Sequence, residues 1–372
     1  APNLPVMEQI GADISWRVWK AKYRSLEEGT FADTWRRVAR ALAAAEMVDR
    51  AGWEQRFYGI LEDFRFLPGG RVQVGAGSGH DVTLFNCFVM GLIEDSIPGI
   101  FSALEEAALT LQQGGGIGYD FSTLRCDHPD IEEFIAAKQQ PATLRRFNLS
   151  VQVTDDFMTA VQENADWPLV FPAATMDGQG ETVMRDWPGN EEKVLCRVLR
   201  HVPARALWGR ILQATYDYAE PGVLFIDRIN KLNNLWYREK ISATNPCGEI
   251  PLPPYGACDL GSINLTRFVS SPFSPRAGFE LAAIKETVKV AVRLLDDVID
   301  VSRFPLPQQA EHAHGTRRIG LGITGLADAL LMLGHQYGSA QSLAVATEVM
   351  RLICHTAYHA SIALGEEKGS FP

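Results

Sequence analysis

Apolar residues recur at helical spacing through residues 12–66, which predicts that this stretch is helical. Pro68-Gly69-Gly70 ends it, because these residues interrupt regular helix. The same periodicity predicts further helices at 96–113, 130–138, 155–162, 207–219, 281–300, 323–333 and 343–367. In the helix predicted over 96–113, one face carries the apolar side chains Ile97, Ile100, Leu104, Ala108 and Leu111.

Short apolar runs rich in β-branched and aromatic residues predict buried strands at 72–74, 83–90, 119–121, 147–153, 222–226 and 260–265. Residues 165–200 are polar and interrupted by Pro and Gly, so they predict no clear helix or strand. Strands that alternate with helices are typical of an α/β fold with mostly parallel strands. We therefore divide the chain into a helical N-terminal region, 1–68, and an α/β domain, 69–372.

Composition limits the function classes. The chain has 372 residues and a formal net charge of −10, which argues against binding a nucleic-acid polymer through its phosphates. No run of 18 apolar residues occurs, so we expect no membrane span. The six cysteines are few and far apart, which argues against a secreted disulfide scaffold and favours a reducing cytoplasm.

The segment Asn245-Pro246-Cys247-Gly248-Glu249 carries the most informative chemistry. Side chains two positions apart in an extended segment point the same way, so the amide, the thiol and the carboxylate can face one substrate. Pro246 and Gly248 favour a tight, non-helical backbone. The sequence thus predicts a thiol, a base and a hydrogen-bonding amide together on a stiff loop, with Cys258 eleven positions beyond Cys247 (258 − 247).

Other cysteines have plainer explanations. Cys196 and Cys354 lie among apolar residues, where cysteine is usually a small hydrophobic side chain. Cys126 stands beside Asp127 and His128, but the spacing fits no zinc pattern, so we expect no metal site. From pattern alone, Cys87 is also best explained as a core residue.

Two segments are rich in glycine, and the first of them has two possible explanations. Gly114–Gly118 is either a phosphate-cradling loop or a helix cap followed by close backbone packing. Arg317-Arg318 with Gly320, Gly322 and Gly325 is best explained as the start of a closely packed helix. No G-x-S-x-G or H-E-x-x-H pattern occurs, so hydrolase chemistry has little support.

Several segments together resemble the catalytic subunit of ribonucleotide reductases, specifically of the adenosylcobalamin-dependent (class II) kind. The matching segments are FRFLPGGR at 64–71, LFNCFV at 84–89, GGGIGYDF at 114–121, FNLSV at 147–151, NPCGE at 245–249, GACDLGSINL at 256–265 and RIGLGITGL at 318–326. They occur in the family's order along nearly the whole chain. The thiol segment together with Cys87 and Cys258 is the specific part of this resemblance.

The resemblance implies a role for each matching residue. Cys247 would become a thiyl radical at the tip of a finger loop inside a barrel and take the 3′ hydrogen of a ribonucleotide. Glu249 would accept the 3′-hydroxyl proton, and Asn245 would orient the sugar. Cys87 and Cys258 would be the dithiol pair that supplies a proton and two electrons and closes into a disulfide. The resemblance also implies substrate contacts from Asn86, Gly116 and Gly70.

The implied cofactor is adenosylcobalamin, which would generate the radical, and the implied reductant is a thioredoxin-like or other dithiol. The implied fold is a ten-stranded α/β barrel, of which this chain would form a part. A thiol with a pKa near 8.5 is mostly protonated at neutral pH and so provides an S–H bond for a radical to attack. We expect that thiol to be buried, since a radical must be kept from solvent.

The chain departs from the family pattern at two places. After Ser122–Arg125, a family stretch that links the substrate base to an allosteric nucleotide is missing, which puts allosteric control and part of the dimer contact in doubt. After Pro372, the family continues through further barrel strands, a phosphate-binding loop and a cysteine-bearing tail. The resemblance therefore implies a complementary chain or a homodimer, and does not distinguish diphosphate from triphosphate substrates.

Three alternatives stay open at this point. The chain is an incomplete or degenerate remnant without turnover, a relative driven by a diiron centre or a glycyl radical, or a plain thiol oxidoreductase that uses Cys87 and Cys258.

Overall fold

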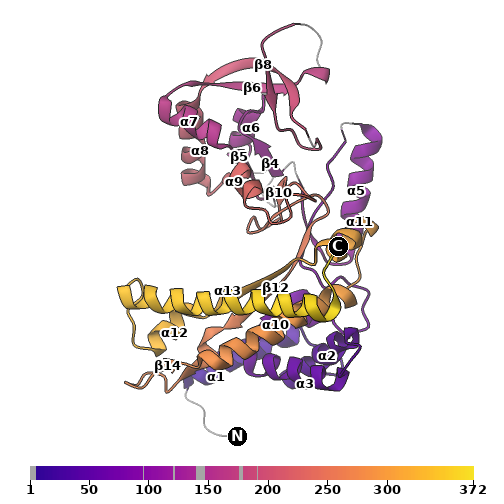
Figure 1. Ribbon diagram of the computed structural model, residues 1–372, viewed down its shortest axis with the longest axis vertical. Helices are drawn as coiled ribbons and strands as arrows, with labels where there is room; N and C mark the ends of the chain where they lie inside the picture. Colours follow the sequence, from indigo (N-terminus) through magenta and orange to yellow (C-terminus); the bar gives the residue numbers. More distant parts are fainter. Residues whose placement is uncertain (1–5, 95, 120–121, 140–146, 176–178, 191) are drawn as a thin grey trace. The chain divides into compact units, whose positions relative to one another are not determined.

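The computed structural model describes residues 6–94, 96–119, 122–139, 147–175, 179–190 and 192–372 (Figure 1). By internal contacts the chain divides into two compact units. Unit 1 comprises residues 1–86, 112–115 and 258–372, and unit 2 comprises residues 87–111 and 116–257. Each unit is described by itself below.

The first part of unit 1 is helical, as its periodicity predicts. It contains α1 (Val6–Lys22), α2 (Phe31–Leu42) and α3 (Arg50–Leu61), with the 3-10 turns η1 (Ala43–Ala45) and η2 (Glu62–Phe64). Asp49 caps α3 by accepting a hydrogen bond from the Gly52 amide. The indole of Trp19 donates to Thr34 at 2.8 Å, which joins α1 to α2 inside the core.

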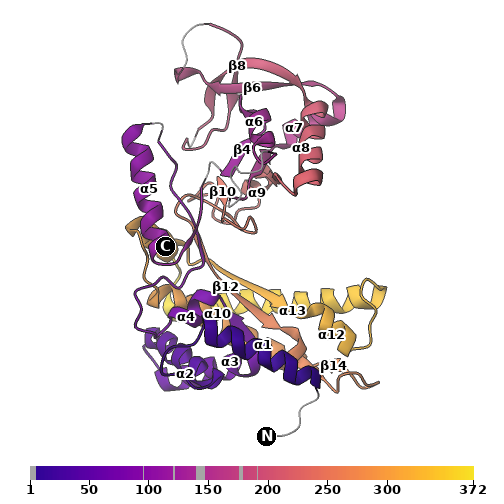
Figure 2. The same ribbon diagram turned by 180° about the vertical axis from the view of Figure 1, so that it is seen from behind.

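The second part of unit 1 contains four more helices: α10 (Leu281–Val301), α11 (Pro307–Thr316), α12 (Leu326–Met332) and α13 (Ala340–Lys368). α10 and α13 lie side by side (Figures 1 and 2). α10 is buried along most of its length because apolar side chains recur on its inner face, among them Ile284, Val288, Ala291, Leu295 and Val298.

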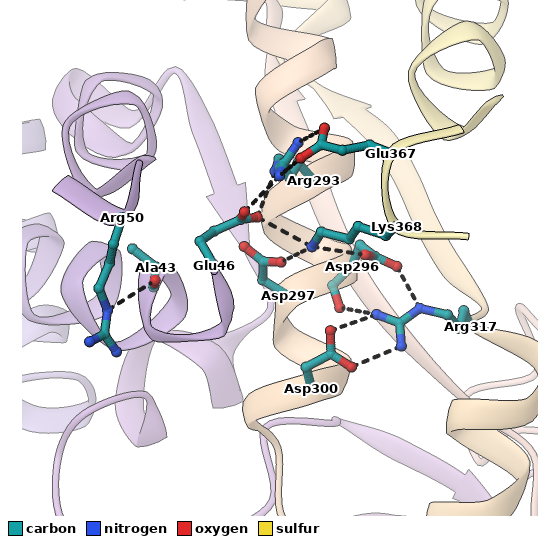
Figure 3. Close-up of polar contacts among 10 residues, drawn as sticks. All are labelled: Ala43, Glu46, Arg50, Arg293, Asp296, Asp297, Asp300, Arg317, Glu367 and Lys368. Carbon is teal, nitrogen blue, oxygen red and sulfur yellow. Dashed lines mark hydrogen bonds and ion pairs between the residues drawn. The ribbon is translucent and has the colours of Figure 1, made fainter. Parts of the chain in front are cut away.

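A charged network ties α10 to the ends of η1 and α13 (Figure 3). Arg293 donates to both oxygens of Glu46 and to both oxygens of Glu367, each at 2.6 Å. The ammonium of Lys368 lies 2.7 Å from Asp297 and 3.2 Å from Glu46. The network is buried at its centre, where Glu46 and Asp297 are at most 6% exposed.

Burial sets the protonation of this centre. It raises the pKa of Asp297 to about 7, against the opposing charge of Lys368. Burial acts the same way on Glu46, but hydrogen bonds from Arg293 and Asp297 outweigh it and lower the pKa of Glu46 to about 2. Asp297 Oδ2 accepts no hydrogen bond within the described part of the chain. When the two carboxyl groups hold one proton between them, Asp297 therefore carries it and Glu46 is ionised.

The sheet of unit 1 corrects one prediction. β1 (Phe66–Pro68) is antiparallel to β12 (Ala257–Asn264), and β15 (Ile319–Thr324) is parallel to β12. The helix predicted at 323–333 is therefore only α12, and the glycines before it belong to a strand. A Cβ on Gly320 would lie 2.4 Å from Leu260, so glycine lets β15 approach β12. A small hairpin, β13 (Val269–Ser270) with β14 (Gly278–Phe279), follows the turn η5 (Leu265–Phe268).

The strand predicted at 72–74 is wrong, because these residues belong to the short helix α4 (Gly70–Gly75). The two valines favour a strand, but tertiary contacts override that preference. Arg37 on α2 donates to the carbonyls of Gln73 and Ala76, which lie at the end of α4. The Gln73 amide also donates back to Pro68 at 2.8 Å.

In unit 2, β4 (Thr123–Arg125), β5 (Ser150–Val153) and β9 (Gly222–Phe225) form a parallel sheet. The described part of this unit contains the helices α5 (Ile97–Gln112), α6 (Ile131–Ala136), α7 (Asp155–Glu163), α8 (Ala204–Tyr218) and α9 (Ile226–Lys231). α6, α7 and α8 pack on the sheet through one apolar core that includes Ile135, Val151, Phe157, Trp167 and Leu207.

Residues 165–200, which predict no clear element, contain an antiparallel sheet instead. β6 (Asp166–Pro172) and β7 (Thr182–Arg185) both pair with β8 (Val194–Pro203), and the turn η4 (Ala173–Thr175) follows β6. Much of β7 and β8 is exposed, so polar side chains hide the strand pattern. A register shift between Leu169 and Val170 breaks the alternation further.

Two more predictions of unit 2 are confirmed only in part. α5 (Ile97–Gln112) matches the predicted helix, and its apolar face is exposed, with Ile97 70%, Leu104 61% and Leu111 54% accessible. Of residues 83–90, only β2 (Cys87–Val89) is a strand. Of the strand predicted at 119–121, residues 120–121 lie outside the described residues, and the strand found is β3 (Gly116–Gly118).

The mixed α/β class with a helical N-terminal region is confirmed. Parallel and antiparallel pairs both occur, and the described residues form no closed barrel.

Candidate active site

The candidate site in unit 2 begins with two paired strands. β2 and β3 are parallel, and Cys87 lies opposite Gly116. On β3, a Cβ on Gly118 would lie 2.5 Å from the Thr244 carbonyl oxygen. Glycine is therefore required where the segment leading to the thiol loop crosses β3. This supports the close-packing explanation of the glycine-rich segment rather than the phosphate loop.

The thiol segment is the loop of a short hairpin, and its backbone is non-helical, as Pro246 and Gly248 predict. β10 (Ala243–Thr244) pairs with β11 (Pro251–Leu252), and residues 245–250 form the loop between them. Asn245 is only 2% exposed and closes the two ends of the loop. Its backbone N–H donates to the Ile250 carbonyl at 3.1 Å, and its side-chain Oδ1 accepts from the Ile250 backbone N–H at 3.0 Å. Gly248 has a φ of +82°, a conformation that favours glycine.

A side chain that the sequence did not single out also holds this loop. Asn148 Nδ2 donates to the Pro246 carbonyl at 2.7 Å. Its signal was its place just before β5, where a polar residue interrupts an apolar run.

The tip of the loop contradicts one expectation. Cys247, Gly248 and Glu249 are exposed, so the thiol is not enclosed. The side-chain hydrogen bonds that hold the loop come at its base, from Asn245, and at Pro246, from Asn148. The loop geometry is as predicted, but its burial was predicted wrongly.

Cys87 lies where the polar groups of the loop meet. Burial raises the pKa of the Cys87 thiol to about 11, hydrogen bonding by Asn245 opposes the rise, and the neighbouring Cys247 and Glu249 add to it. The structure therefore brings Asn245, Cys247 and Glu249 together with Cys87. Asn245 Nδ2 lowers the energy of the thiolate from nearby, yet it is buried and has no hydrogen bond of normal geometry within the described residues. It remains free to bind another polar group.

Cys258 belongs to unit 1. It is 5% exposed on β12, and its thiol contacts the Asp259 carbonyl at 3.5 Å. A Cβ on Gly320 would lie 3.3 Å from its sulfur, so the neighbouring strand leaves room for the thiol. All six cysteines, each within the described residues, are unbridged thiols. The pairing of Cys87 with Cys258 stays a prediction.

The two other predicted substrate contacts of unit 1 share one turn. Gly70 begins α4, and Asn86 Oδ1 accepts a hydrogen bond from the next amide, that of Arg71, at 3.2 Å. A Cβ on Gly69 would lie 3.0 Å from the Asn86 amide nitrogen. This turn thus presents backbone and amide groups at one place.

Comparison with protein families decides the classification. Residues 85–127 and 123–372 match the family described as "Ribonucleotide reductase, barrel domain". Residues 12–81 match "Ribonucleotide reductase, all-alpha domain". This chain belongs to the ribonucleotide reductase large-chain family.

Curated ribonucleotide reductases show the degree of similarity. The chain is 37% identical to the vitamin B12-dependent ribonucleoside-diphosphate reductase of Mycobacterium tuberculosis, over 90% of this chain and 52% of the relative. It is 33% identical to the protein of the same name from Thermoplasma acidophilum, over 85% of this chain and 44% of the relative. It is 26% identical to the ribonucleoside-diphosphate reductase subunit alpha of Chlamydia trachomatis, over 94% of this chain and 39% of the relative. The chain spans about half the length of the B12-dependent relatives.

Unit 2 of this ribonucleotide reductase chain also contains a cavity of about 510 Å³ that the sequence did not reveal. It lies past the carboxyl ends of β4, β5 and β9, where ligands commonly bind in parallel sheets. Its lining includes Trp167, Trp187, Asp227 and Ser242, and the last of these directly precedes β10. A sequence signal existed in the polar residues that follow each strand.

Charged groups order one wall of this cavity. Arg125 donates two hydrogen bonds to Asp127 at 2.8 and 2.7 Å, and Arg185 donates a third at 3.1 Å. Arg125 also lies over the Trp187 ring at 5.5 Å. This wall is therefore held in place by hydrogen bonds, and its two guanidinium groups outnumber the one carboxylate.

Among the described residues, no helix has the length and apolar composition needed to cross a bilayer.

Proposed function

We propose that this chain carries the hydrogen-donating thiol of a ribonucleotide reductase, and that Cys247 is that thiol. The observation that supports it most is the grouping of Asn245, Cys247 and Glu249 around the Cys87 thiol in unit 2. The grouping joins β2 to a loop more than 150 residues later. A cysteine that served only for packing would need no such neighbours.

In the proposed reaction, a Cys247 thiyl radical takes the 3′ hydrogen atom of a ribonucleotide and becomes a thiol again. Glu249 accepts the 3′-hydroxyl proton, and the unpartnered Nδ2 of Asn245 binds the same sugar. The 2′-hydroxyl leaves as water after it gains a proton. One thiol of the pair Cys87 and Cys258 supplies that proton, and the other adds a hydrogen atom to C2′. The pair passes on one further electron as it closes into a disulfide, Glu249 returns its proton to O3′, and Cys247 returns a hydrogen atom to C3′.

We assign the substrate contacts that the resemblance implies to Gly116, Gly70 and Asn86. Gly116 is next to Cys87 across β2 and β3, and Asn86 contacts the turn that contains Gly70.

We propose adenosylcobalamin as the cofactor, since relatives at 33–37% identity are named vitamin B12-dependent. When bound, this group supplies an adenosyl radical that can take a hydrogen atom from a thiol. The residues present fit that chemistry, because Cys247 presents a thiol on an exposed loop.

Two partners follow from this proposal. Because the tip of the loop is exposed, turnover requires a cover, from a complementary chain or a second copy. Because the dithiol ends as a disulfide, an external dithiol of the thioredoxin kind must reduce it.

The test is formation of a deoxyribonucleotide from a ribonucleoside diphosphate or triphosphate, with adenosylcobalamin and dithiothreitol. The chain is assayed alone and together with a polypeptide that supplies the rest of a relative's length. We expect Cys247→Ser to abolish product, and the exposed Cys354→Ser of unit 1 to leave it unchanged. Product from neither preparation, or product from Cys247→Ser, would contradict the proposal.

A second candidate is a plain thiol oxidoreductase that uses Cys87 and Cys258. It predicts disulfide exchange that survives Cys247→Ser, measured by reduction of a small disulfide. The raised pKa of Cys87 speaks against it, because a thiol with a pKa of about 11 is a poor nucleophile at neutral pH.

A further inference from the structure

Unit 1 contains a groove of about 480 Å³ between α10 and α13, closed at one end by Trp53 of α3. Lys285, Lys289 and Arg293 are four positions apart on α10, so they form one stripe with a step of about 6 Å. His355 and His359 form a matching stripe on α13. The floor is apolar and small, with Leu352, Ala360 and Ala363.

Most of the basic groups in this groove are not used by the fold. Lys285, His355 and His359 make no ion pair or hydrogen bond within the described part of the chain. Lys289 has only an exposed partner, Glu286 at 2.7 Å, and such pairs contribute little. These groups can therefore serve a ligand at little structural cost.

The charge balance of the groove favours an anion. Of the described residues that line it, Lys285, Lys289 and Arg293 are cationic and Glu367 is the acid. The whole chain, by contrast, has a net charge of −10. Because Glu46 and Glu367 already neutralise Arg293, the positive charge available to a small anion lies on Lys285 and Lys289.

The closed end shows what the ligand would meet. Arg293 already binds Glu367, whose side chain is 54% exposed (Figure 3). The guanidinium groups of Arg293 and Arg56 lie 4.0 and 4.3 Å from the Trp53 ring centre, so that ring is already covered by cations. A stacked aromatic ligand therefore has no obvious place there, whereas an anion could take the position of Glu367.

We propose that this groove binds the oligophosphate group of a small molecule, with Lys285 and Lys289 as its main contacts and Glu367 as the resident carboxylate that it displaces. Cations at regular steps on one helix suit an extended chain of phosphates better than a single charge. The proposal rests on unit 1 alone and stands or falls separately from the thiol chemistry.

The test is isothermal titration calorimetry of the full chain with inorganic triphosphate and, in parallel, with ATP. We expect saturable binding with a Kd below about 1 mM at low salt, weakened by added NaCl. Equal affinities would assign the site to the phosphates alone, and tighter ATP binding would add a contact to the nucleoside. Absence of saturable binding of either probe up to about 10 mM would overturn the proposal.

Two variants with opposite signs sharpen the result. Lys285→Ala/Lys289→Ala should weaken binding about tenfold, since two exposed charge contacts are lost. Glu367→Gln should tighten it about threefold by removing the competing charge. Lys22→Ala, a basic residue of α1 outside the groove, is the matched control and should change nothing. Equal affinity in the wild type and in the double variant would also overturn the proposal, with circular dichroism confirming that each variant is folded.

Discussion

The loop that carries Cys247 and the charged network around Arg293 solve different physical problems. In the loop, the chemical groups are exposed and the only buried polar anchor is Asn245 at the base. In the network, the central charges are buried, and nearly every charged group has a partner at 2.6–3.5 Å. The difference teaches that the buried ion pairs of this chain join its helices, whereas the thiol and carboxylate of the loop have few contacts that fix them. The variants below test that contrast.

The largest effect on stability should come from Arg293→Met. It leaves Glu46 buried without its main partner, which costs about 3–5 kcal/mol in the free energy of unfolding. Chemical denaturation measures this loss. Arg36→Met, which breaks the exposed pair with Asp33, is the control and should cost less than about 1 kcal/mol. Similar losses for the two variants would show that the network is not a stabilising centre.

The next effect should come from Gly118→Ala, in the floor under the thiol loop. The added methyl group meets the Thr244 carbonyl oxygen at 2.5 Å, and because that oxygen is backbone, relief requires the loop to move. We expect a loss of about 2–3 kcal/mol and weaker turnover. Gly209→Ala in α8 meets nothing within 4 Å and should instead stabilise by up to about 1 kcal/mol. Thermal unfolding of both variants decides whether this contact positions the loop.

A smaller, pH-dependent effect should come from Asp297→Asn. The folded-state pKa of Asp297 is about 7 and the unfolded value is about 4, so the folded chain holds a proton that the unfolded chain releases. Wild-type stability contributed by this group therefore falls as pH rises from about 4 to 7. The amide keeps a donor toward Glu46 without titrating.

The variant should thus gain at least about 1 kcal/mol on the wild type between pH 5 and pH 8. Urea unfolding at the two pH values measures the gain. A difference that does not depend on pH would contradict a protonated Asp297.

The smallest effect should come from Asn148→Ala, which removes the hydrogen bond to the Pro246 carbonyl. We expect a cost of about 0.5–1 kcal/mol and faster hydrogen exchange at Gly248, with little change elsewhere. Asn190→Ala, which loses a similar bond to Pro188, is the control and should leave Gly248 unchanged. Unaltered exchange at Gly248 would mean that Asn245 alone holds the loop.

The helices were largely predictable because a long apolar stripe leaves a strong signal. α10 and α13 differ from their predicted bounds by at most three residues. The strands were less predictable, since their identity depends on neighbours. The valines of α4 favour a strand, but hydrogen bonds from Arg37 hold this segment as a helix. β15 can pair with β12 because Gly320 has no Cβ to clash with Leu260.

The candidate site was predictable where chemistry is local and not where it is tertiary. The order Asn245, Cys247, Glu249 along one loop could be deduced from spacing and turn residues. The contact of that loop with Cys87 came only through the resemblance, because nothing in the pattern links positions 160 residues apart (247 − 87). Exposure of the tip could not be predicted at all, because it depends on which strands surround it.

The Glu249 side chain is exposed, so any cover over the loop would have to remove water from its carboxylate. A hydrated carboxylate loses several kcal/mol of solvation when it is shut away from water, unless a hydroxyl or a proton replaces the water. A ribose hydroxyl provides that replacement, and an empty pocket does not. If Cys247 acts as proposed, closure over it would be coupled to the presence of a sugar, and a radical would form mainly when a substrate is there to react with it.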